Sequence, residues 1–513
     1  MVVHLRRTTN SGPRVARLFG CMLSGAWLVA WWSLGIQLLP LLGHGGLMTA
    51  DAWVARARAA GLSPWQAAPS HLWWAHGDWA LVATAVLGLL AASAALVGLW
   101  PRRSLALTAG LYVGAGAPLG ELFPMLADKL LLEATLVGLA LSRERPRPWA
   151  HWLARLLVIK LYLHVGASQW LAPHNDWQSG AALGSFLVTT PLPTPLGWWL
   201  DHLPGPLLSL LTKAVLLTEL FAPFCLLGPR PLRLVAALGL TALQVAALIL
   251  VNYGLFAFVA VALHLFFLDE RDVDAIAHDL GRLHPALGRA AGRALGAPQK
   301  QAHAELQVPA SLQAVHVALL AAYAALGLSS FWQARHRFAG VTDTAAPLAR
   351  ALGHWQMVHA YTHLGSPAGV RAEPVFERKV HGEWQPVELW REPGDPFRAP
   401  SFVAPHLPRL DVALATWGQS AYAALHPRGG GAGVAAESLA LPAYAGGLLE
   451  QLCRPAPRIQ RLVRSSLSAR PSAVRLRLMR YEPASTAALG SAGLWWNRAE
   501  EAVLAEHGCP AGD

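Results

Sequence analysis

Residues 234–251 read LVAALGLTALQVAALILV, and runs of this kind decide the fold of the chain. The run carries no charged residue and is long enough for a helix that crosses most of the hydrocarbon core of a bilayer. Similar apolar runs recur from residue 18 to residue 332. Buried helices of soluble proteins seldom contain apolar stretches of this length. The sequence therefore predicts an α-helical multi-pass membrane protein.

The composition of the 513 residues agrees with this prediction. Hydrophobic residues make up 54% of the chain and charged residues 14%, whereas soluble domains carry about 25% charged residues. The net charge of +11 is typical of a membrane protein whose cytoplasmic loops are rich in Lys and Arg. No basic stripe alternates with aromatic residues, so binding to nucleic acid is not expected.

We expect about nine transmembrane helices. The predicted spans are residues 18–42, 79–100, 104–126, 129–142, 152–171, 207–228, 234–251, 254–268 and 311–332. The third is interrupted by Gly, Pro and Glu121 and the fourth is short, so residues 104–142 could instead re-enter the membrane from one side. Residues 272–296 have apolar residues at helical spacing and arginines on other faces, which predicts either a basic amphipathic helix on the cytoplasmic leaflet or a solvated connector.

Arg and Lys concentrate in alternate loops, which predicts a cytoplasmic N-terminus and a C-terminus on the opposite side of the membrane. The composition, rich in Ala, Arg and Leu, favours a bacterial plasma membrane and a periplasmic C-terminus. In a eukaryote the same topology would place the C-terminus in the lumen of the endoplasmic reticulum. Residues 1–333 are thus expected to form a transmembrane helical domain, and residues 334–513 a non-cytoplasmic α+β domain that is strand-rich in its first half.

Three features of the C-terminal region predict its local structure. His381-Gly382 lies between runs of β-branched and aromatic residues, which indicates a hairpin. Residues 441–470 are predicted to be helical and residues 474–481 alternate like a strand. Cys453 and Cys509 could form a disulfide in an oxidising compartment, although their spacing carries no pairing information.

Polar side chains within the apolar segments are the first candidates for function. A charge at the centre of a bilayer costs roughly 3 kcal/mol, so such side chains usually pair or line a cavity. Alternatively, they hold helices together or reach for the interface near helix ends. The candidate intramembrane polar residues are Asp128, Glu133, Lys160, Glu219, Gln244 and Asn252.

No catalytic residue is predicted. The sequence contains no G-x-S-x-G motif, Walker A motif or G-x-G-x-x-G after a strand. His354, His359 and His363 could share one face, but no Glu or Cys motif completes a metal site. His406 and Asp411 have the H-x4-D spacing of some acyltransferases, in which a base is oriented by a carboxylate, but two prolines interrupt it. We therefore expect no metal, no cofactor and no enzymatic activity.

Residues 402–411 read FVAPHLPRLD and resemble the F-V-A-P-H-x-P-R-L-D signature of the lipase maturation factor family. Further resemblances follow in the order of the family between about residues 120 and 500. They are DKLLLE at 128–133, TTPLPTP at 189–195, Glu219-Leu220 with Pro223, Gln244 with Asn252-Tyr253, LDE at 268–270, WQPVE at 384–388, EPGD at 392–395 and WWNR at 495–498. Each motif is short, but their collinear order makes the resemblance specific.

The chain departs from the pattern of the family at four places. Phe186-Leu187-Val188 stand where the family has H-Y-E, and Ala127 stands where it has Trp. Lys160 replaces an Arg of the family, and Gln169 replaces a Lys. These changes put in doubt any function that depends on the missing groups.

The resemblance implies a membrane-bound chaperone. Animal members of the family are similar to proteins of the endoplasmic reticulum that help secreted dimeric lipases reach an active fold. By this resemblance, the partners are a secreted lipase-like client and the lipid bilayer. The client-binding or scaffold motif would comprise Pro405, His406, Pro408, Arg409 and Asp411. Within it, Arg409 and Asp411 are expected to hold a proline-rich corner by a charge-assisted bond.

Two other classes of function remain open. A membrane enzyme of the vitamin-K-carboxylase type, whose helical region has a loosely similar pattern, would use Lys160 as a base with His164 one turn further on. A lipid or solute transporter would use Glu133 and Glu219 to line a path. The sequence lacks paired half-repeats interrupted by Gly and Pro, which is a point against a transporter.

Overall fold

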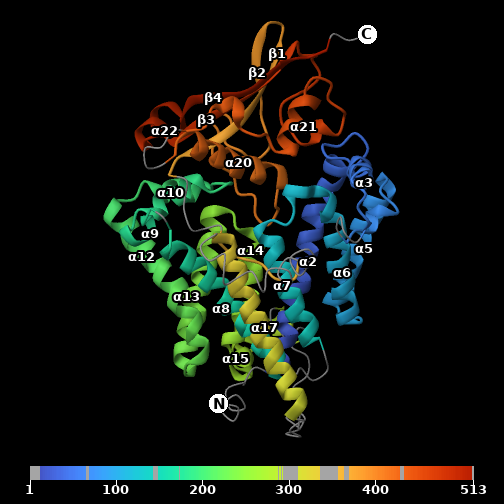
Figure 1. Cartoon of the computed structure of the whole chain (residues 1–513). Helices are drawn as coiled ribbons and strands as arrows, with labels where there is room; N and C mark the ends of the chain where they lie inside the picture. Colours follow the sequence, from blue (N-terminus) through green and yellow to red (C-terminus); the bar gives the residue numbers. More distant parts are fainter. Residues whose placement is uncertain are drawn as a thin grey trace.

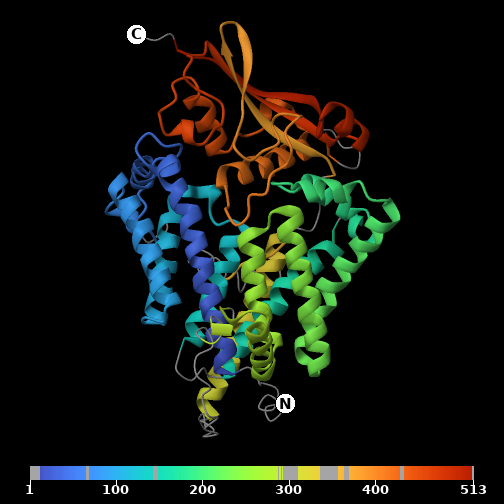
Figure 2. The ribbon, with the colours of Figure 1, turned by 180° about the vertical axis from the view of Figure 1, so that it is seen from behind.

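A bundle of long helices carries a layer of sheet and short helices at one end (Figure 1). The computed structural model describes residues 12–64, 69–142, 148–172, 174–286, 288–289, 292, 310–335, 356–362, 369–427 and 433–510. We call the helices up to residue 335 the helical bundle and residues 369–510 the sheet layer. The view from behind shows the same two tiers (Figure 2).

The helical bundle contains long helices joined by short helical turns. The long and medium helices are α2 (Pro13–Leu42), α3 (Ala50–Ala59), α5 (Asp78–Leu96), α6 (Pro101–Gly116), α7 (Leu126–Leu141), α8 (Pro148–Trp170), α12 (Gly205–Phe221), α13 (Arg230–Val251), α14 (Gly254–His264), α15 (Glu270–Leu283) and α17 (Ala310–Arg335). The shorter elements are η1 (His71–Trp73), η2 (Ala117–Leu122), α9 (Asp176–Ser179), α10 (Ala182–Thr189), α11 (Pro195–Asp201), η3 (Ala222–Leu227) and η4 (Leu265–Phe267).

Six helical segments of the described chain are long and apolar enough to cross a membrane, so the count of nine is wrong. The six are Pro13–Leu42, Asp78–Leu96, Pro101–Leu122, Gly205–Leu227, Arg230–Val251 and Ser311–Ala334. The other three predicted spans correspond to α7, α8 and α14. These are helices, but α7 and α14 are short and α8 carries polar groups along its length.

Burial explains why three central helices do not read as spans. Most residues of α7, α8 and α14 are buried, so their polar groups meet protein partners instead of lipid. By contrast, only 17% of the apolar window of α17 and 22% of that of α13 is buried. The peripheral helices are therefore apolar because they face lipid, and the central ones can be polar because they do not.

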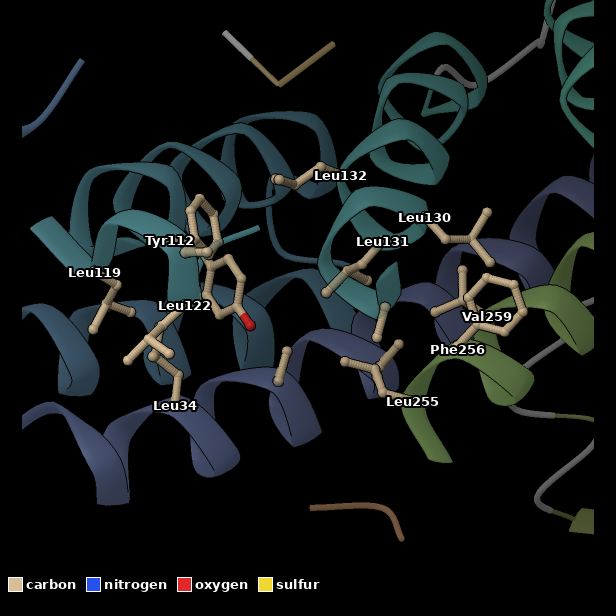
Figure 3. Close-up of a cluster of buried hydrophobic side chains, with 14 of the residues drawn as sticks. Leu34, Tyr112, Leu119, Leu122, Leu130, Leu131, Leu132, Leu255, Phe256 and Val259 are labelled. Atoms are coloured by element: carbon tan, nitrogen blue, oxygen red, sulfur yellow. The ribbon is translucent and has the colours of Figure 1, made fainter. Parts of the chain in front are cut away.

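The centre of the bundle is packed with branched apolar side chains. Figure 3 shows Leu130 of α7 beside Phe256 and Val259 of α14, and Leu119 and Leu122 of η2 near the ring of Tyr112. All of these side chains belong to the main hydrophobic cluster of the chain. Close packing of this kind fixes α7 in the middle of the bundle.

Helix α15 is held against the bundle by ion pairs at its start. Asp269 bonds to Arg233, with 2.7 Å between oxygen and nitrogen, and Asp272 bonds to Arg230. The backbone N–H of Arg14 donates to Glu270 at 3.0 Å. The predicted helix over 272–296 is confirmed as far as Leu283, and Arg293 lies outside the described residues.

The sheet layer is built on four antiparallel strands in the order β2-β1-β3-β4. They are β1 (Arg371–Val380), β2 (Glu383–Val387), β3 (Ala473–Pro483) and β4 (Trp496–Gly508). Helices α20 (Arg409–Leu425), α21 (Ala443–Gln451) and α22 (Thr486–Ala492), with the turns η5 (Ala436–Ser438) and η6 (Ile459–Arg461), complete the layer.

The sheet confirms two local predictions and corrects two others. Val380 pairs with Glu383, and the positive φ of His381 and Gly382 suits the tight hairpin between β1 and β2. The predicted strand at 474–481 lies within β3. The first half of the region is not strand-rich, because β3 and β4 lie in the second half. Of residues 441–470, only Ala443–Gln451 form an α-helix.

Cys453 and Cys509 form a disulfide. The bond joins the end of α21 to the end of β4, two segments 56 residues apart. Cys21 and Cys225, in the helical bundle, are free thiols. A disulfide in the sheet layer is typical of a protein region that faces an oxidising compartment.

Candidate functional site

The sheet layer is fastened to the helical bundle by one buried ion pair between Arg409 and Asp128. The two guanidinium nitrogens of Arg409 donate to the two carboxylate oxygens of Asp128, at 2.7 and 2.8 Å. Arg409 also donates to the carbonyl of Leu122 at 2.8 Å and to the hydroxyl of Tyr112 at 2.9 Å. Both charged side chains are almost fully buried. A bidentate pair of this kind is among the strongest polar contacts that a protein forms.

Asp128 is also held by hydrogen bonds from within the helical bundle. It lies in the first turn of α7, where its Oδ2 accepts the backbone N–H of Met125 at 2.8 Å. This is the bond of a helix N-terminal cap. The hydroxyl of Tyr112 donates to Oδ1 at 2.7 Å. The carboxylate therefore accepts bonds from α6, from the start of α7 and from the sheet layer.

Two polar residues of α2 receive the segment that precedes Arg409. The hydroxyl of Ser33 lies 2.9 Å from Nδ1 of His406 and accepts the backbone N–H of Leu407 at 2.9 Å. Gln37, one helical turn later, accepts the N–H of Arg409 at 2.8 Å and donates to the carbonyl of Leu407 at 2.9 Å. The backbone of the signature is thus hydrogen-bonded to two side chains of the membrane helix α2.

Asn252 binds the other end of the signature. It ends α13 in the left-handed conformation, with φ of 56°, which Asn tolerates better than most residues. Its side-chain oxygen accepts the N–H of Val403 at 2.8 Å, and its nitrogen donates to the carbonyls of Ser401 at 2.9 Å and Leu192 at 3.0 Å. One amide therefore joins α13, the loop before α11 and the signature.

The predicted bond between Arg409 and Asp411 is wrong. Arg409 bonds to Asp128, while Asp411 accepts the backbone N–H of Arg391 at 2.8 Å. His406 and Asp411 also have different partners, so they do not form a base and its orienter. Arg409 and Asp411 are buried, at 1% and 5% exposure, and do not form a surface of the sheet layer, whereas Pro405 of the motif is exposed.

Arg371, at the start of β1, is a second fastening point. It is fully buried and bonds to Glu373. It also donates to the carbonyls of Val188 and Pro191, each at 3.0 Å. These carbonyls belong to the last turn of α10 and to the loop after it, so β1 is anchored to the bundle directly.

Glu133 and Lys160 form a second buried ion pair, deeper in the bundle. Lys160 of α8 bonds to Glu133 of α7. The hydroxyls of Tyr323 and Tyr361 donate to the two oxygens of Glu133, each at 2.6 Å. The ammonium group also lies 5.2 and 5.4 Å from the centres of the two tyrosine rings. This polar centre neutralises its own charge and joins α7, α8, α17 and the segment at 356–362.

Gln244 and Glu219 belong to neither ion pair. Gln244 donates to the hydroxyl of Tyr162 at 2.9 Å, and that hydroxyl lies 2.7 Å from Nε2 of His264. Glu219 is buried on α12 and lines a cavity of about 170 Å³ together with Gln244. The six intramembrane candidates are thus divided among four places in the bundle.

A larger cavity lies between the two tiers. Its volume is about 1060 Å³, which matches the upper end of ligand pockets, about 300–1,000 Å³. We call it the interface cavity. It is lined by α20, the start of α7, α10 and the turn at Asn252-Tyr253.

The described residues do not contain a group of three His, Cys, Asp or Glu side chains placed to hold a metal ion. Nε2 of His359 lies 3.2 Å from the carbonyl of Gln356. His354 and His363, the other members of the predicted trio, lie outside the described residues. His164 packs against the rings of Phe331 and Tyr361.

Several partners in this site were not anticipated from the sequence. They are Ser33, Gln37, Tyr112, Arg371, Tyr323 and Tyr361. Ser33 and Gln37 did carry a signal, because an amide and a hydroxyl one turn apart in an apolar helix share a face. The tyrosines carried none, since Tyr is common near membrane interfaces.

The apolar peripheral helices, the polar centre and the fastened sheet layer define a polytopic membrane protein with a large extramembrane layer. The chain belongs to the lipase maturation factor family. The family profile described as the lipase maturation factor transmembrane domain matches residues 14–275. That range contains Asp128, Glu133 and Asn252, whereas Arg409 lies outside it.

Curated relatives support the same assignment. Lipase maturation factor 2 of Mus musculus is 32% identical over 146 residues, or 28% of this chain and 20% of that protein. Lipase maturation factor 2 of Homo sapiens is 28% identical over 296 residues, or 52% of this chain and 41% of that protein. This chain thus spans less than half of the length of these relatives. No solved structure matches it.

Removal of either partner of the Arg409–Asp128 pair should destabilise the protein strongly. Arg409→Met or Asp128→Leu leaves one buried charge unpaired, which typically costs about 3–5 kcal/mol. The double variant should lose less than either single variant, because it leaves no charge behind. Thermal unfolding of the purified protein in detergent measures this order.

The matched control is Arg391→Met, since the side chain of Arg391 is exposed and only its backbone bonds to Asp411. This variant should unfold at the temperature of the unmodified protein. A double variant less stable than both singles would contradict the assignment of the pair.

Stability should also fall as the pH rises from about 4 to about 7. Burial raises the pKa of Asp411 to about 6, and the carboxylate of Glu373 adds to this. The folded protein then binds a proton that the unfolded chain releases, so deprotonation costs up to about 3 kcal/mol by pH 8. Asp411→Asn keeps an acceptor for the N–H of Arg391 and should flatten unfolding temperature against pH in this window. An unchanged slope would show that another group titrates.

Proposed function

We propose that this chain is a non-enzymatic maturation factor that helps an exported lipase-like hydrolase to fold or assemble. Membership of the family supports a role in lipase maturation, and the curated relatives are named lipase maturation factors. The client would bind to the sheet layer, and the bundle would hold that layer at the membrane surface.

One observation carries this proposal: the signature region divides its side chains by chemistry. Its polar residues are used internally: Arg409 and His406 fasten the layer to the bundle, and Asp411 accepts the backbone N–H of Arg391 within the layer. The large apolar side chains of the preceding loop, Trp390 and Phe397, are 50% and 60% exposed. Exposed apolar groups on a firmly held loop are what a surface that binds a partly folded client requires.

The enzyme alternative receives less support from the same geometry. Lys160, the proposed base, bonds to Glu133 and lies against two tyrosine rings. A base engaged in such a buried ion pair would have to break the pair before it could act on a substrate. Neither Lys160 nor Glu133 lines the interface cavity or the smaller cavity beside Glu219.

We further propose that residues 1–333 form the membrane domain and that residues 334–513 lie on the exported side. The alternation of basic loops and the disulfide between Cys453 and Cys509 both favour this orientation. The exported side would be the periplasm in a bacterium or the lumen of the endoplasmic reticulum in a eukaryote.

Thiol alkylation of cells tests the orientation. With the sheet layer exported, a maleimide reagent added under denaturing conditions should modify only Cys21 and Cys225 until a reductant is added, after which Cys453 and Cys509 also react. The variant Cys453→Ser/Cys509→Ser should give the same labelling with and without reductant. Full labelling of the unmodified protein without reductant would place the layer in a reducing compartment.

Deletion of the gene, with complementation, tests the proposed function. Cells without the protein should secrete a dependent lipase in normal amount but with lost specific activity, because the defect is in folding and not in synthesis. Complementation with Trp390→Ser/Phe397→Ser should restore activity only in part. Val503→Ser, which changes an exposed apolar residue of β4, is the matched control and should restore it fully.

The maturation-factor and enzyme hypotheses give different results in this assay. If Lys160→Met abolishes activity while Trp390→Ser/Phe397→Ser does not, the enzyme reading gains and the proposal fails. If no secreted hydrolase changes in specific activity, the proposal also fails. The amount of each variant in the membrane must be equal, so that a loss of stability is not read as a loss of function.

A further inference from the structure

We propose that the interface cavity and the cavity beside Glu219 form one binding site for a neutral lipid of the acylglycerol class. The polar head would lie in the interface cavity, and an acyl chain would extend into the bundle. This site is separate from the exposed loop at Trp390 and Phe397, and the proposal does not depend on which client the protein serves.

The two cavities adjoin each other. Four residues line both of them: Phe186, Val251, Tyr253 and Phe256. One cavity lies between the bundle and α20, and the other lies between α8, α10, α12 and α13. A ligand that occupies both must therefore be long, with one end at the junction of the tiers and the other among the helices.

The cavity beside Glu219, which we call the inner cavity, favours an acyl chain. Its walls are mostly aliphatic and aromatic side chains, with Leu243, Ala247 and Leu250 contributed by α13, and its polar lining residues include Gln169, Glu219 and Gln244. Its volume is about 170 Å³. An engineered apolar cavity of about 150 Å³ stays dry and binds benzene. A space of this size and lining therefore gains from filling by methylene groups, at about 0.8 kcal/mol each.

The interface cavity favours a neutral, hydroxyl-bearing head. Its polar lining consists mainly of hydroxyl and amide groups, among them Thr190, Thr416, Gln419 and Ser420, together with the imidazoles of His174 and His426. Among the described residues that line it there is no Lys or Arg, and Glu121 contributes an acidic group. Phosphate groups are normally bound by Arg or Lys. The lining thus fits the glycerol hydroxyls of an acylglycerol and disfavours an anionic phospholipid.

A photo-reactive monoacylglycerol tests the site. The probe has an 18-carbon chain with a diazirine near its end, and the full chain is reconstituted in nanodiscs of phosphatidylcholine. After irradiation, mass spectrometry should find the probe on the residues of α8, α12 and α13 that line the inner cavity. An excess of monoolein should compete for this labelling, whereas an excess of dioleoylphosphatidylglycerol should not.

Two substitutions in α13 separate binding in the cavity from contact with bulk lipid. Ala247→Phe fills the inner cavity and, by excluding about two methylene groups, should weaken labelling about tenfold. Ala242→Phe adds the same side chain on an exposed face of α13 and should leave labelling unchanged. Leu243→Ala enlarges the cavity and should retain labelling, which guards against a variant that merely folds poorly.

Each outcome decides the proposal. Labelling spread over the lipid-facing surface, or equal loss in Ala247→Phe and Ala242→Phe, would show bulk lipid only and overturn it. Equal competition by the phosphatidylglycerol would overturn the assignment of a neutral head. Absence of labelling in the inner cavity would leave the interface cavity to a peptide of a client and would also overturn it. The assay contains no lipase, so its failure is distinguishable from failure of the proposed maturation role.

Discussion

The architecture depends on a carboxylate that the bundle cannot neutralise by itself. Asp128 lies at the start of α7 and accepts bonds from Tyr112 and Met125, but these donors are neutral. Its only ion-pair partner among the described residues is Arg409 of the sheet layer. A buried charge without its partner is far less stable than a paired one. Asp128 is therefore the residue of the bundle whose buried charge depends on the sheet layer being in place.

Helix α7 supplies the acidic member of both buried ion pairs, and the two acids lie little more than one turn apart. Asp128 faces the sheet layer, and Glu133 faces Lys160, Tyr323 and Tyr361. The rest of the helix packs against α14 and α2 through leucines. The peripheral helices need only be apolar, since lipid surrounds them. Polar side chains are thus concentrated in the centre of the bundle, where protein partners satisfy their hydrogen bonds.

The sequence predicted the class of fold but not the pairing within it. Long apolar runs identify membrane helices wherever lipid surrounds them, as in α13, but short central helices such as α7 read ambiguously because protein surrounds them. The hairpin at His381-Gly382 was predictable because its signal is local. Helix α20 was hidden by the prolines before it.

The candidate polar residues were recognisable because charges in apolar runs are conspicuous, yet their partners were not. Arg409 and Asp128 are 281 residues apart, and no local pattern connects residues at that distance. The local sequence instead favoured Asp411, the nearest acid, as the partner of Arg409. Asp411 accepts a backbone N–H at a distance of 20 residues, which periodicity likewise does not encode.

During synthesis of the chain, the two members of the same ion pair are made at different times. A ribosome that adds about 5–20 residues per second makes Arg409 roughly 14–56 s after Asp128. Tyr361, which bonds to Glu133 across 228 residues, also arrives late. During that interval α7 carries an acidic group that has no counter-charge. The buried polar groups of the bundle thus lack their partners until the last third of the chain has been made. A truncated chain would keep these groups unpaired, and quality-control proteins of the membrane could recognise them.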